Sequence, residues 1–373
     1  MRIALVMKKV LFHLNTLEQG GVERVVSNLA NHFAGTYYDI IVATQWYSED
    51  EFALKPLVKR IHVGLKADDE RKSRFVKVYL RIKYLRKLII IEKPDVVIAF
   101  DRNTNYRAII SSLGLKTPVI ISIRNSPTAQ FNSILQKLLA SVLFPKASGC
   151  VFQTNQQRSY FSKRLQRKSR VILNPINPKY INVTPPSEKK KEIVHSSRLE
   201  ERKNQAGIVR AFIKLHDEYP DYTLKIFGGD TGDGTKKKLK RIITENYAND
   251  YIKLMGRSDS LETELSGASI FVFNSDWEGL PNALMEAMAL GLPVISTDCP
   301  SGGPATLITD KINGMLIPVR NDVKLEEAMR YLLNNPDIAE KMGQAARRIS
   351  DKCNIAAISN EWCVYIDEII CNQ

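Results

Sequence analysis

Short apolar segments alternate with helical patterns along almost the whole chain, as in parallel sheets whose strands are joined by helices. In the first half, the strand candidates are Val10–Leu14, Ile40–Thr44, Val96–Phe100, Val119–Ile123, Gly149–Phe152 and Val171–Leu173. Helical patterns lie between them, at about Gly21–Ala34, Phe75–Ile91, Asn105–Leu113, Ser133–Leu143 and Gln156–Leu165. The first half is therefore expected to form one α/β domain.

A proline-rich stretch interrupts this alternation near the middle of the chain, from Asn174 to Lys191. The alternation then restarts, with strand candidates at Ile193–Ser196, Thr223–Phe227, Ile252–Leu254, Ile270–Phe273, Val294–Ser296 and Met315–Ile317. A last helical pattern covers Asn354–Ile370. We predict a first domain at residues 1–178, a linker at 179–191, a second domain at 192–352 and a C-terminal helix at 353–373.

Composition limits the possible functions. With 373 residues and 44% hydrophobic residues, the chain can form two sizeable cores, and no apolar run reaches the roughly 18 residues of a membrane span. The segment Met1–Leu14 is typical of a first strand rather than a signal peptide, and the natural start, Met1 or Met7, stays open. The five cysteines show no CxxC or metal-ligand spacing, which favours reduced thiols in a cytosolic protein without a metal.

The positive charge is concentrated in the first half. Residues 1–185 contain 30 Lys and Arg against 12 Asp and Glu, a net charge of +18, whereas residues 186–373 contain 24 against 28, a net charge of −4. Such a half-molecule favours an anionic partner: nucleic acid, an acidic membrane surface or a phosphorylated substrate. No RNA-binding or DNA-binding motif is visible, so nucleic acid is not expected.

The segment Lys72–Lys87 has the pattern of a basic amphipathic helix. Its apolar stripe contains Phe75, Val78, Tyr79, Ile82, Leu85 and Leu88 or Ile89, and the cations expected elsewhere on the helix include Lys77, Arg81, Arg86 and Lys87. A second basic cluster covers Arg158–Arg170. Two interpretations stay open: core-packed helices with solvated basic faces, or a surface that meets an anionic membrane and the pyrophosphate of a lipid-linked acceptor.

The most informative tract in the second half contains two carboxylates, Glu278 and Glu286. The apolar run Ile270–Phe273 predicts a strand, Pro281 fits the first position of a helix, and Gly291 fits its end. Glu278 is then expected on the loop after the strand and Glu286 inside the helix. Ligands of open α/β sheets bind at this edge, and the amides and dipole of a helix N-terminus favour phosphate.

Four other segments have the residue types of a phosphate-binding site. Gly20 and Gly21 let backbone amides approach an anion at a helix start, and Arg198 and Lys203 supply cations. Gly228 and Gly229 form a turn after a strand, without the GxGxxG spacing of a dinucleotide cofactor. Arg257 follows the next strand.

Together these segments resemble the retaining glycosyltransferases of family 4, whose E-x7-E motif matches the tract from Glu278 to Glu286. The resemblance implies the GT-B fold: α/β, two Rossmann-like parallel-sheet domains facing an interdomain cleft, with a C-terminal helix crossing back to the first domain. It implies that Glu278 touches the transferred sugar and that Glu286 holds the ribose of the nucleotide. It also implies a metal-independent reaction without a cofactor, with UDP as the expected nucleotide.

The resemblance extends to the other site residues. Arg198 and Lys203 would clamp the diphosphate of the nucleotide sugar, whose negative charge grows as the diphosphate leaves. The remaining residues expected at the substrates are Gly20, Gly21, Asn125, Gly228, Gly229, Arg257, Gly279, Leu280, Pro281, Asn282, Ala283 and Leu284.

One departure from the family concerns the segment after the strand Val119–Ile123. Many relatives have a histidine there, but this chain has Arg124 and Asn125, and its five histidines lie elsewhere. An arginine stays protonated and cannot act as a general base, although it can bind phosphate or sugar hydroxyls. A similar Arg-Asn pair appears among relatives that extend lipid-linked oligosaccharides, so Arg124 is included in the expected catalytic set.

The sequence thus predicts a peripheral enzyme at the cytoplasmic face of a bacterial membrane. It would transfer a hexose or N-acetylhexosamine from a nucleotide sugar to a glycan in surface-polysaccharide synthesis, and a lipid-linked glycan is the expected acceptor. Two alternatives stay open: another GT-B enzyme such as a sugar-nucleotide epimerase, and a non-catalytic protein that binds membranes or nucleic acid.

Overall fold

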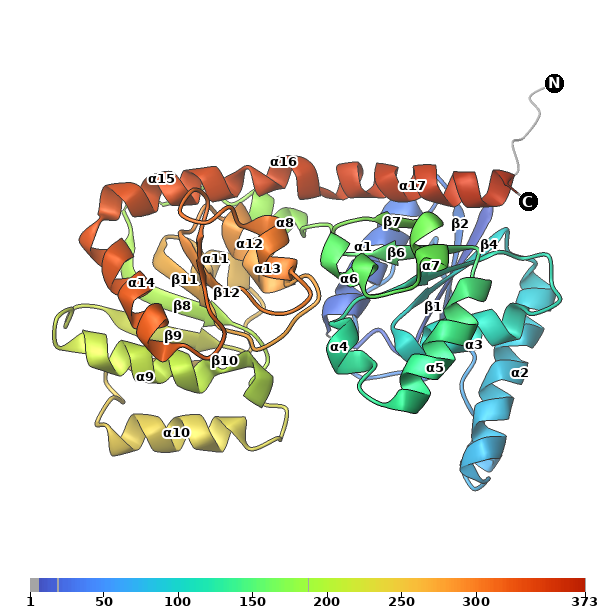
Figure 1. The fold of residues 1–373 in the computed structure, drawn as a ribbon, viewed down its shortest axis with the longest axis horizontal. Coiled ribbons are helices and arrows are strands. Elements are labelled where there is room, and N and C mark those ends of the chain that lie inside the picture. The colour runs from blue at the N-terminus through green and yellow to red at the C-terminus, as the bar shows by residue number, and fades with distance from the viewer. Residues whose placement is uncertain (1–6, 19, 187, 373) are drawn as a thin grey trace. The chain divides into compact units, whose positions relative to one another are not determined.

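The computed structural model describes residues 7–18, 20–186 and 188–372, so the possible start at Met1 lies outside the described residues. The chain divides into two compact units (Figure 1). The first contains the chain up to Pro175 together with the segment from Ile355 onward, and the second is Ile176–Asn354. Each unit has its own parallel sheet, which confirms the expected pair of α/β units.

The first sheet has seven strands in the order β3-β2-β1-β4-β5-β6-β7, all parallel. They are β1 Lys9–Leu14, β2 Asp39–Thr44, β3 Lys59–His62, β4 Val96–Phe100, β5 Val119–Ser122, β6 Gly149–Phe152 and β7 Ser169–Val171. The apolar runs predicted all of these except β3, an edge strand whose four residues are only partly buried or exposed. The prediction for β7 was displaced, since the strand shares only Val171 with the run Val171–Leu173.

Helices cover both faces of this sheet. They are α1 Gly21–Phe33, α2 Arg74–Glu92, α3 Arg102–Ser112, α4 Pro127–Gln130, α5 Ile134–Leu143, α6 Asn155–Ser159, α7 Lys163–Arg167 and α17 Ile355–Cys371, with 3-10 turns η1 Ala67–Asp69 and η2 Phe144–Lys146. The single helix predicted at Gln156–Leu165 is wrong. Two short helices form instead, with Thr154 and Ser162 at their N-cap positions.

The C-terminal helix α17 belongs to the first unit, as expected. Its Trp362 and Ile366 are buried in the core beneath α1. The Tyr365 hydroxyl accepts a hydrogen bond from the Cys150 amide (2.8 Å) and donates one to the Lys168 carbonyl (2.7 Å). The other face of the sheet carries a second core, to which α2, α3 and α5 contribute residues.

The second sheet has six parallel strands in the order β10-β9-β8-β11-β12-β13. They are β8 Lys190–Ser196, β9 Thr223–Phe227, β10 Ile252–Gly256, β11 Ala268–Phe273, β12 Val294–Thr297 and β13 Met315–Ile317. The strands β8 and β11 lie side by side at the centre, so the loops that follow them leave the same edge of the sheet.

The helices of the second unit are α8 Pro178–Ile181, α9 Gln205–His216, α10 Thr235–Glu245, α11 Leu261–Leu265, α12 Asn282–Ala289, α13 Gly303–Leu307, α14 Asp322–Asn334, α15 Pro336–Arg347 and α16 Ile349–Cys353, with a 3-10 turn η3 Glu201–Lys203. The helix α8 and the first residues of β8 overlap the segment 179–191, which the sequence assigned to a linker.

Candidate functional site

Loops that follow β8 and β9 contact each other closely at one edge of the second sheet. The Ser197 amide donates to the Phe227 carbonyl (3.0 Å), and the Leu199 amide donates to the Gly229 carbonyl (2.9 Å). Gly228 has a φ of +148°, and a Cβ atom on it would overlap the Ser197 carbonyl oxygen. Glycine is therefore needed here for the close approach of two backbones.

Arg257 lies beside this glycine turn. It follows β10, its side chain is exposed, and a Cβ atom on Gly229 would lie 2.6 Å from its Nε atom. The structure thus brings together Gly229 and Arg257, from two segments that follow the neighbouring strands β9 and β10.

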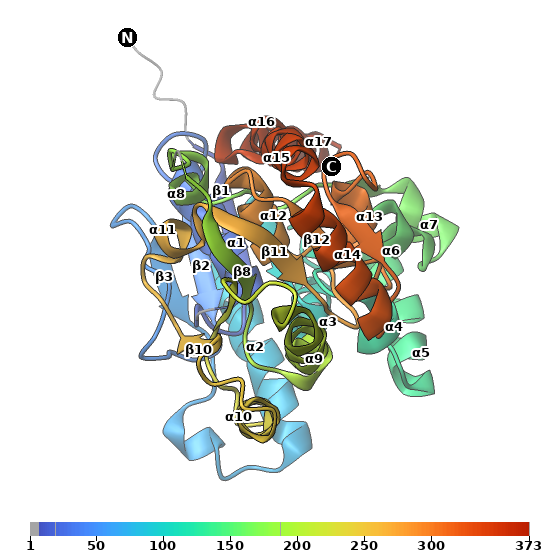
Figure 2. The same cartoon turned by 90° about the vertical axis from the view of Figure 1, so that its left-hand side faces the viewer.

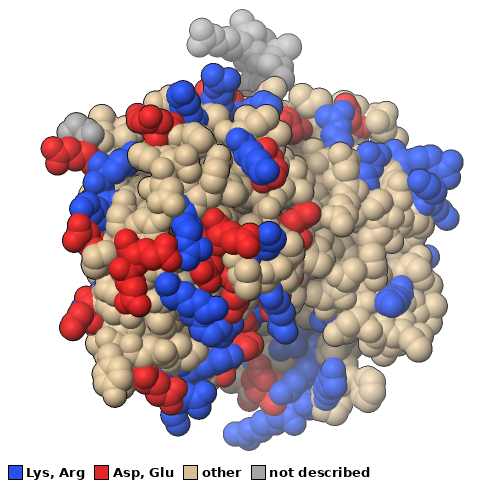
Figure 3. Space-filling model, turned by 60° about the vertical axis from the view of Figure 1, so that its left-hand side comes forward, with Lys and Arg blue, Asp and Glu red and all other residues tan. Residues whose placement is uncertain are grey.

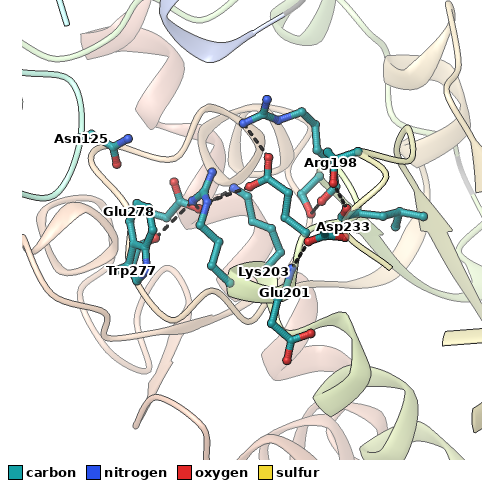
Figure 4. Close-up of polar contacts among 12 residues, drawn as sticks. Asn125, Arg198, Glu201, Lys203, Asp233, Trp277 and Glu278 are labelled. Atoms are coloured by element: carbon teal, nitrogen blue, oxygen red, sulfur yellow. Dashed lines mark hydrogen bonds and ion pairs between the residues drawn. The ribbon is translucent and has the colours of Figure 1, made fainter. Parts of the chain in front are cut away.

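The turn after β8 carries a chain of alternating charges (Figure 4). Arg198 Nη2 lies 2.7 Å from Glu200 Oε1, and Arg202 Nε lies 2.8 Å from Glu200 Oε2. Arg202 Nη1 lies 2.8 Å from Glu278 Oε1, and Lys203 forms an ion pair with the same carboxylate oxygen. The structure therefore links Lys203 directly, and Arg198 indirectly, to Glu278.

Arg202 is a member of this cluster that the sequence did not single out. Its guanidinium also lies 4.6 Å from the centre of the Trp277 ring, and its Nη1 donates to the Trp277 carbonyl (3.3 Å). The alternation Arg198, Glu200, Arg202 looks like a solvated charged face in the sequence. What distinguishes Arg202 is its partner Glu278, which lies about 75 residues further along the chain and is not evident as a partner from the sequence.

Glu278 is a buried carboxylate that stays ionised. Its exposed fraction is 8%. Burial alone would raise the pKa of Glu278, but the charges of Lys203 and Arg202 offset this effect and hold the pKa below its ordinary value. Lys203 is partly buried, and burial lowers the pKa of its ammonium group although Glu278 opposes the shift.

His195, at the end of β8, supports the same turn. Its Nδ1 lies 2.8 Å from the Val272 carbonyl, and its Nε2 lies 2.7 Å from Ser197 Oγ. Burial lowers the pKa of His195 to about 4. The ring is therefore neutral at pH 7 and adds no charge to the cluster.

Two further contacts fix the loop that carries Glu278. The Asp276 amide donates to the Arg202 carbonyl (2.8 Å), and the Asp276 carboxylate pairs with Arg320 Nη2 (2.6 Å). Gly303 packs so closely on this loop that a Cβ atom there would overlap the Gly279 carbonyl oxygen. Glu278 is thus held on a supported loop.

The helix α12 begins immediately after this loop. Pro281 was predicted at the first helical position, but it is the N-cap residue and the helix begins one residue later, at Asn282. Gly291 follows the last turn with a φ of +75°. Gly279, Leu280, Pro281 and Leu284 are buried, whereas Asn282 and Ala283 are partly exposed at the first turn. Glu286 lies inside the helix, as predicted, and its exposed fraction is only 4%.

The predicted residues of the first unit lie on separate elements. Gly20 and Gly21 form the start of α1, where the Arg24 amide donates to the Gly20 carbonyl (3.0 Å). Asn125 follows β5 and is partly buried, and its carbonyl accepts from Gln157 Nε2 (3.3 Å). Both glycines lie at a helix start, as expected, but a Cβ atom on Gly20 would overlap the Glu23 carboxylate, and phosphate binding there stays a prediction.

Arg124 is almost completely buried in the first unit. Its guanidinium carbon lies 5.2 Å from the Phe100 ring centre and 5.6 Å from that of Trp362, and its Nη1 donates to Asn174 Oδ1 (2.8 Å). Burial lowers the pKa of Arg124 to about 9. These contacts tie β5 to α17, a packing position that the sequence-based assignment to the catalytic set did not anticipate.

The basic helix α2 forms, but its buried face differs from the predicted stripe. Leu80, Leu85, Leu88 and Ile89 are buried. Phe75, Val78 and Tyr79 were placed on the apolar stripe, yet all three are exposed because the first turns of α2 extend beyond the sheet (Figure 1). The stripe predicted for residues 75–79 therefore does not pack on the core.

The four cations assigned to a membrane or pyrophosphate contact differ from one another in their partners and in their exposure. Lys77 pairs with Glu70 (2.9 Å), and Arg86 Nη1 donates to the carbonyls at the end of α3, with 2.7 Å to that of Leu113. Arg81 is half-buried, and only Lys87 is exposed. Arg86 therefore caps a neighbouring helix, a structural role the sequence did not reveal.

Acidic and basic side chains are interspersed on the surface drawn in Figure 3. In the second unit, Lys191 pairs with Asp221 (2.6 Å) and Lys238 with Glu201 (2.9 Å). Exposed pairs of this kind contribute little to stability. They do balance the charge of the second unit.

The described residues offer neither a membrane-spanning helix nor a cluster of metal ligands. None of the helices is both long and apolar enough to cross a membrane. Within the same residues, His, Cys, Asp and Glu side chains form no group of three or more that could hold a metal ion.

Comparison with known families places both halves of the chain in one class of enzymes. The family described as "Glycosyltransferase Family 4" matches residues 19–180, and that described as "Glycosyl transferases group 1" matches residues 177–349. A relative from Haemophilus influenzae, named an uncharacterized glycosyltransferase, is 26% identical over 95% of this chain and 99% of its own length.

A second relative has a named substrate. It is the N-acetylgalactosamine-N,N'-diacetylbacillosaminyl-diphospho-undecaprenol 4-alpha-N-acetylgalactosaminyltransferase of Campylobacter jejuni, 25% identical over 94% of this chain and 98% of its own. Among solved structures, Anabaena HepE in complex with UDP superposes with a TM-score of 0.80 at 15% identity, covering 97% of this chain and all of that one. Sucrose-phosphate synthase from Thermosynechococcus elongatus superposes with a TM-score of 0.83 at 15% identity, covering 98% and 100%.

Proposed function

Because this chain belongs to glycosyltransferase family 4 and has the GT-B fold, we propose that it transfers a hexose or N-acetylhexosamine from a UDP-sugar to a lipid-linked glycan. The reaction proceeds with retention of the anomeric configuration and without a metal, at an anionic membrane surface. It serves the synthesis of a bacterial surface polysaccharide.

The observation that carries this proposal is the pairing of the buried Glu278 with Lys203 and Arg202 beside the first turn of α12. Three cations (Arg198, Arg202 and Lys203) share two carboxylates (Glu200 and Glu278), which leaves one net positive charge. Because a buried pair is weakly screened, this surplus attracts a diphosphate. The amides of the α12 start add donors for its oxygens.

The proposed roles follow from exposure and pairing. Arg198 is half-exposed, and its pair with Glu200 is a surface contact of small energy, so it turns to the diphosphate when the nucleotide sugar binds. Lys203 neutralises charge on the leaving phosphate while it holds Glu278 in place. Glu278 in turn faces the sugar and stabilises positive charge that develops on the ring.

Glu286 and the glycine turns complete the proposed nucleotide site. A carboxylate inside α12 accepts hydrogen bonds from the ribose hydroxyls, while Gly228, Gly229 and the Arg257 segment admit the phosphates and the base. In the first unit, Gly20 and Gly21 at the start of α1 offer backbone amides to an anionic group of a substrate. Arg124 is proposed as a positioning residue that fixes the backbone before Asn125, and Asn125 as the group that contacts the acceptor.

The acceptor and the membrane are inferred from the relatives and from charge. The Campylobacter jejuni relative is named for a diphospho-undecaprenol acceptor, and the first 185 residues of this chain carry a net charge of +18. A pyrophosphate-linked lipid in an anionic leaflet presents the charge that such a unit attracts.

A panel of nucleotide sugars tests the proposal. The matching sugar should raise the melting temperature of the protein, since a ligand that binds only the folded state stabilises it. The same compound, incubated with a polyprenyl-diphosphate oligosaccharide, should yield a glycan longer by one residue, with or without EDTA. Stabilisation by the nucleotide sugar followed by its epimerisation without an acceptor would instead identify an epimerase, and the absence of any stabilisation would favour a non-catalytic binding protein.

A further inference from the structure

The helix α5 presents an apolar face that the protein does not cover. Its exposed side chains and their exposed fractions are Ile134 87%, Leu135 64%, Leu138 58%, Leu139 40% and Val142 54%. Among the side chains of α5, Ala140 is the one that is fully buried. A contiguous apolar face on a stable helix marks a surface for interaction.

The helix itself is well anchored. Ser133 and Gln136 form a capping box at its start, and Tyr106 Oη donates to the Gln136 carbonyl (3.3 Å). Leu143 packs on the core of the first unit at the other end. The exposed leucines therefore project from a fixed helix.

The chain segment that contains α5 carries charge of one sign. From residue 102 to residue 187 the chain contains no Asp or Glu, although it contains 13 Lys and Arg. The turn η2 contacts both α5 and α7, which places α7 near the apolar face. The exposed cations of these elements are Lys137, Lys146, Lys163, Arg164 and Arg167.

The first turns of α2 also expose apolar side chains, here with acids nearby, since Lys77 pairs with Glu70 (2.9 Å). Phe75 and Tyr79 are 86% and 60% exposed, next to the exposed cations Arg74 and Lys83. The helix α3 contacts both α2 and α5. Figures 1 and 2 both draw α5 and the start of α2 toward the lower end of the first unit.

We propose that α5 inserts its apolar face into the interface of an anionic lipid bilayer, with the flanking cations on the lipid headgroups and the first turns of α2 as a second contact. This inference rests on the proposed function and adds to it the residues that anchor the enzyme. A helix of 10 residues is about 15 Å long, too short to cross a bilayer but sufficient to lie in its surface.

Charge complementarity favours a bilayer over a second copy of the chain. Two copies that met through this face would bring their cations together without any acid between residues 102 and 187 to balance them. An anionic leaflet supplies both the negative charge and the hydrocarbon.

The test compares vesicle binding of the full chain and of the variant Leu135→Gln/Leu138→Gln. The vesicles contain phosphatidylcholine with one quarter phosphatidylglycerol, and the control variant is Ile312→Gln/Val323→Gln, which replaces two exposed apolar residues of the second unit (62% and 56%). We expect the α5 variant to bind at least about tenfold more weakly, because burying a single leucine is already worth roughly tenfold. The control variant should bind like the unchanged protein.

A second measurement detects insertion of α5 directly and does not rely on a variant that loses vesicle binding. Tryptophan fluorescence of Leu138→Trp should shift to the blue on anionic vesicles and be quenched by brominated lipids. Equal vesicle binding by the α5 variant and the unchanged protein, or no quenching, would overturn the proposal. So would a blue shift without lipid together with a dimer in light scattering, since this result assigns the face to a second copy.

Donor binding is scored separately in the same samples. Thermal stabilisation by the nucleotide sugar without vesicles, combined with unaltered vesicle binding of the α5 variant, refutes the membrane inference and leaves the proposed transfer intact. Loss of vesicle binding by the α5 variant without any stabilisation by a nucleotide sugar supports the membrane surface and refutes the transferase instead.

Discussion

Replacing Glu278 by glutamine should both destabilise the second unit and abolish most transfer. The carboxylate is buried and pairs with two cations, so the amide leaves positive charge without its partner in the interior. Arg202 keeps Glu200 as a second partner, whereas no second ion pair is seen for Lys203 among the described residues. The loss of stability is therefore expected to come mainly from Lys203, which is left without an ion-pair partner.

The magnitude follows from the burial of the pair. The side chains of Lys203 and Glu278 are 12% and 11% exposed, and removing one partner of a buried pair costs roughly 3–5 kcal/mol. The glutamine oxygen still accepts a hydrogen bond, so we expect a value near the lower end, about 3 kcal/mol. For a unit of this size that corresponds to a fall of roughly 6–12 °C in melting temperature.

The assay is thermal unfolding of Glu278→Gln, Lys203→Met and the double variant. The double variant should be more stable than Glu278→Gln, because the charge left without a partner has been removed. Asp221→Asn is the matched control, since it removes an acid from an exposed pair (60% and 71% exposed side chains) and should cost less than about 1 kcal/mol. A Glu278→Gln melting temperature equal to that of the control would refute the buried network.

Three further outcomes are expected. Arg198→Ala should weaken UDP binding in calorimetry by roughly 10-fold to 100-fold and leave uridine binding unchanged, because a charge-assisted hydrogen bond to phosphate is lost; equal losses for both ligands would contradict the diphosphate role. Glu286→Ala should weaken uridine and UDP binding alike, whereas unchanged affinity would exclude a ribose contact. The pKa of His195 lies at about 4 in the folded protein against 6.5 ordinarily, so its contribution, roughly 3 kcal/mol at most, is complete above pH 6.5 and is lost as the pH falls toward 4. The stability difference between the protein and His195→Gln, measured by urea unfolding, should therefore shrink over this pH range; a constant difference would show that the ring titrates normally.

The central tract was predictable because its signals are local. Pro281 and Gly291 mark the two ends of α12 to within a residue, and the apolar run before Glu278 marks β11. Those local signals place Glu278 on a loop and Glu286 in a helix without any tertiary information. The edge strand β3 has no apolar run, so no such signal existed for it.

Pairing and burial were not predictable in the same way. Arg202 and Lys203 are adjacent in the sequence to Glu200 and Glu201, and only the fold shows that both cations reach Glu278. Arg124 follows a strand like a site residue, yet the return of α17 buries it against Trp362.

The helix α5 illustrates the same limit. Its leucine pattern is that of a helix packed on a core, and the sequence does not show whether another element covers it. In the structure Leu135 and Leu138 stay exposed. Coverage of a helix face depends on the arrangement of elements distant in sequence, which periodicity does not encode.

The stereochemistry of the product tests the account most directly. If the departing phosphate of the nucleotide sugar helps to deprotonate the acceptor hydroxyl, the new bond forms on the face that the diphosphate leaves, and Glu278 only stabilises the sugar. The anomeric proton of the product, measured by NMR after transfer from an α-linked nucleotide sugar, should then show an α-glycoside. A β-glycoside would contradict both the retaining mechanism and the role proposed for Glu278.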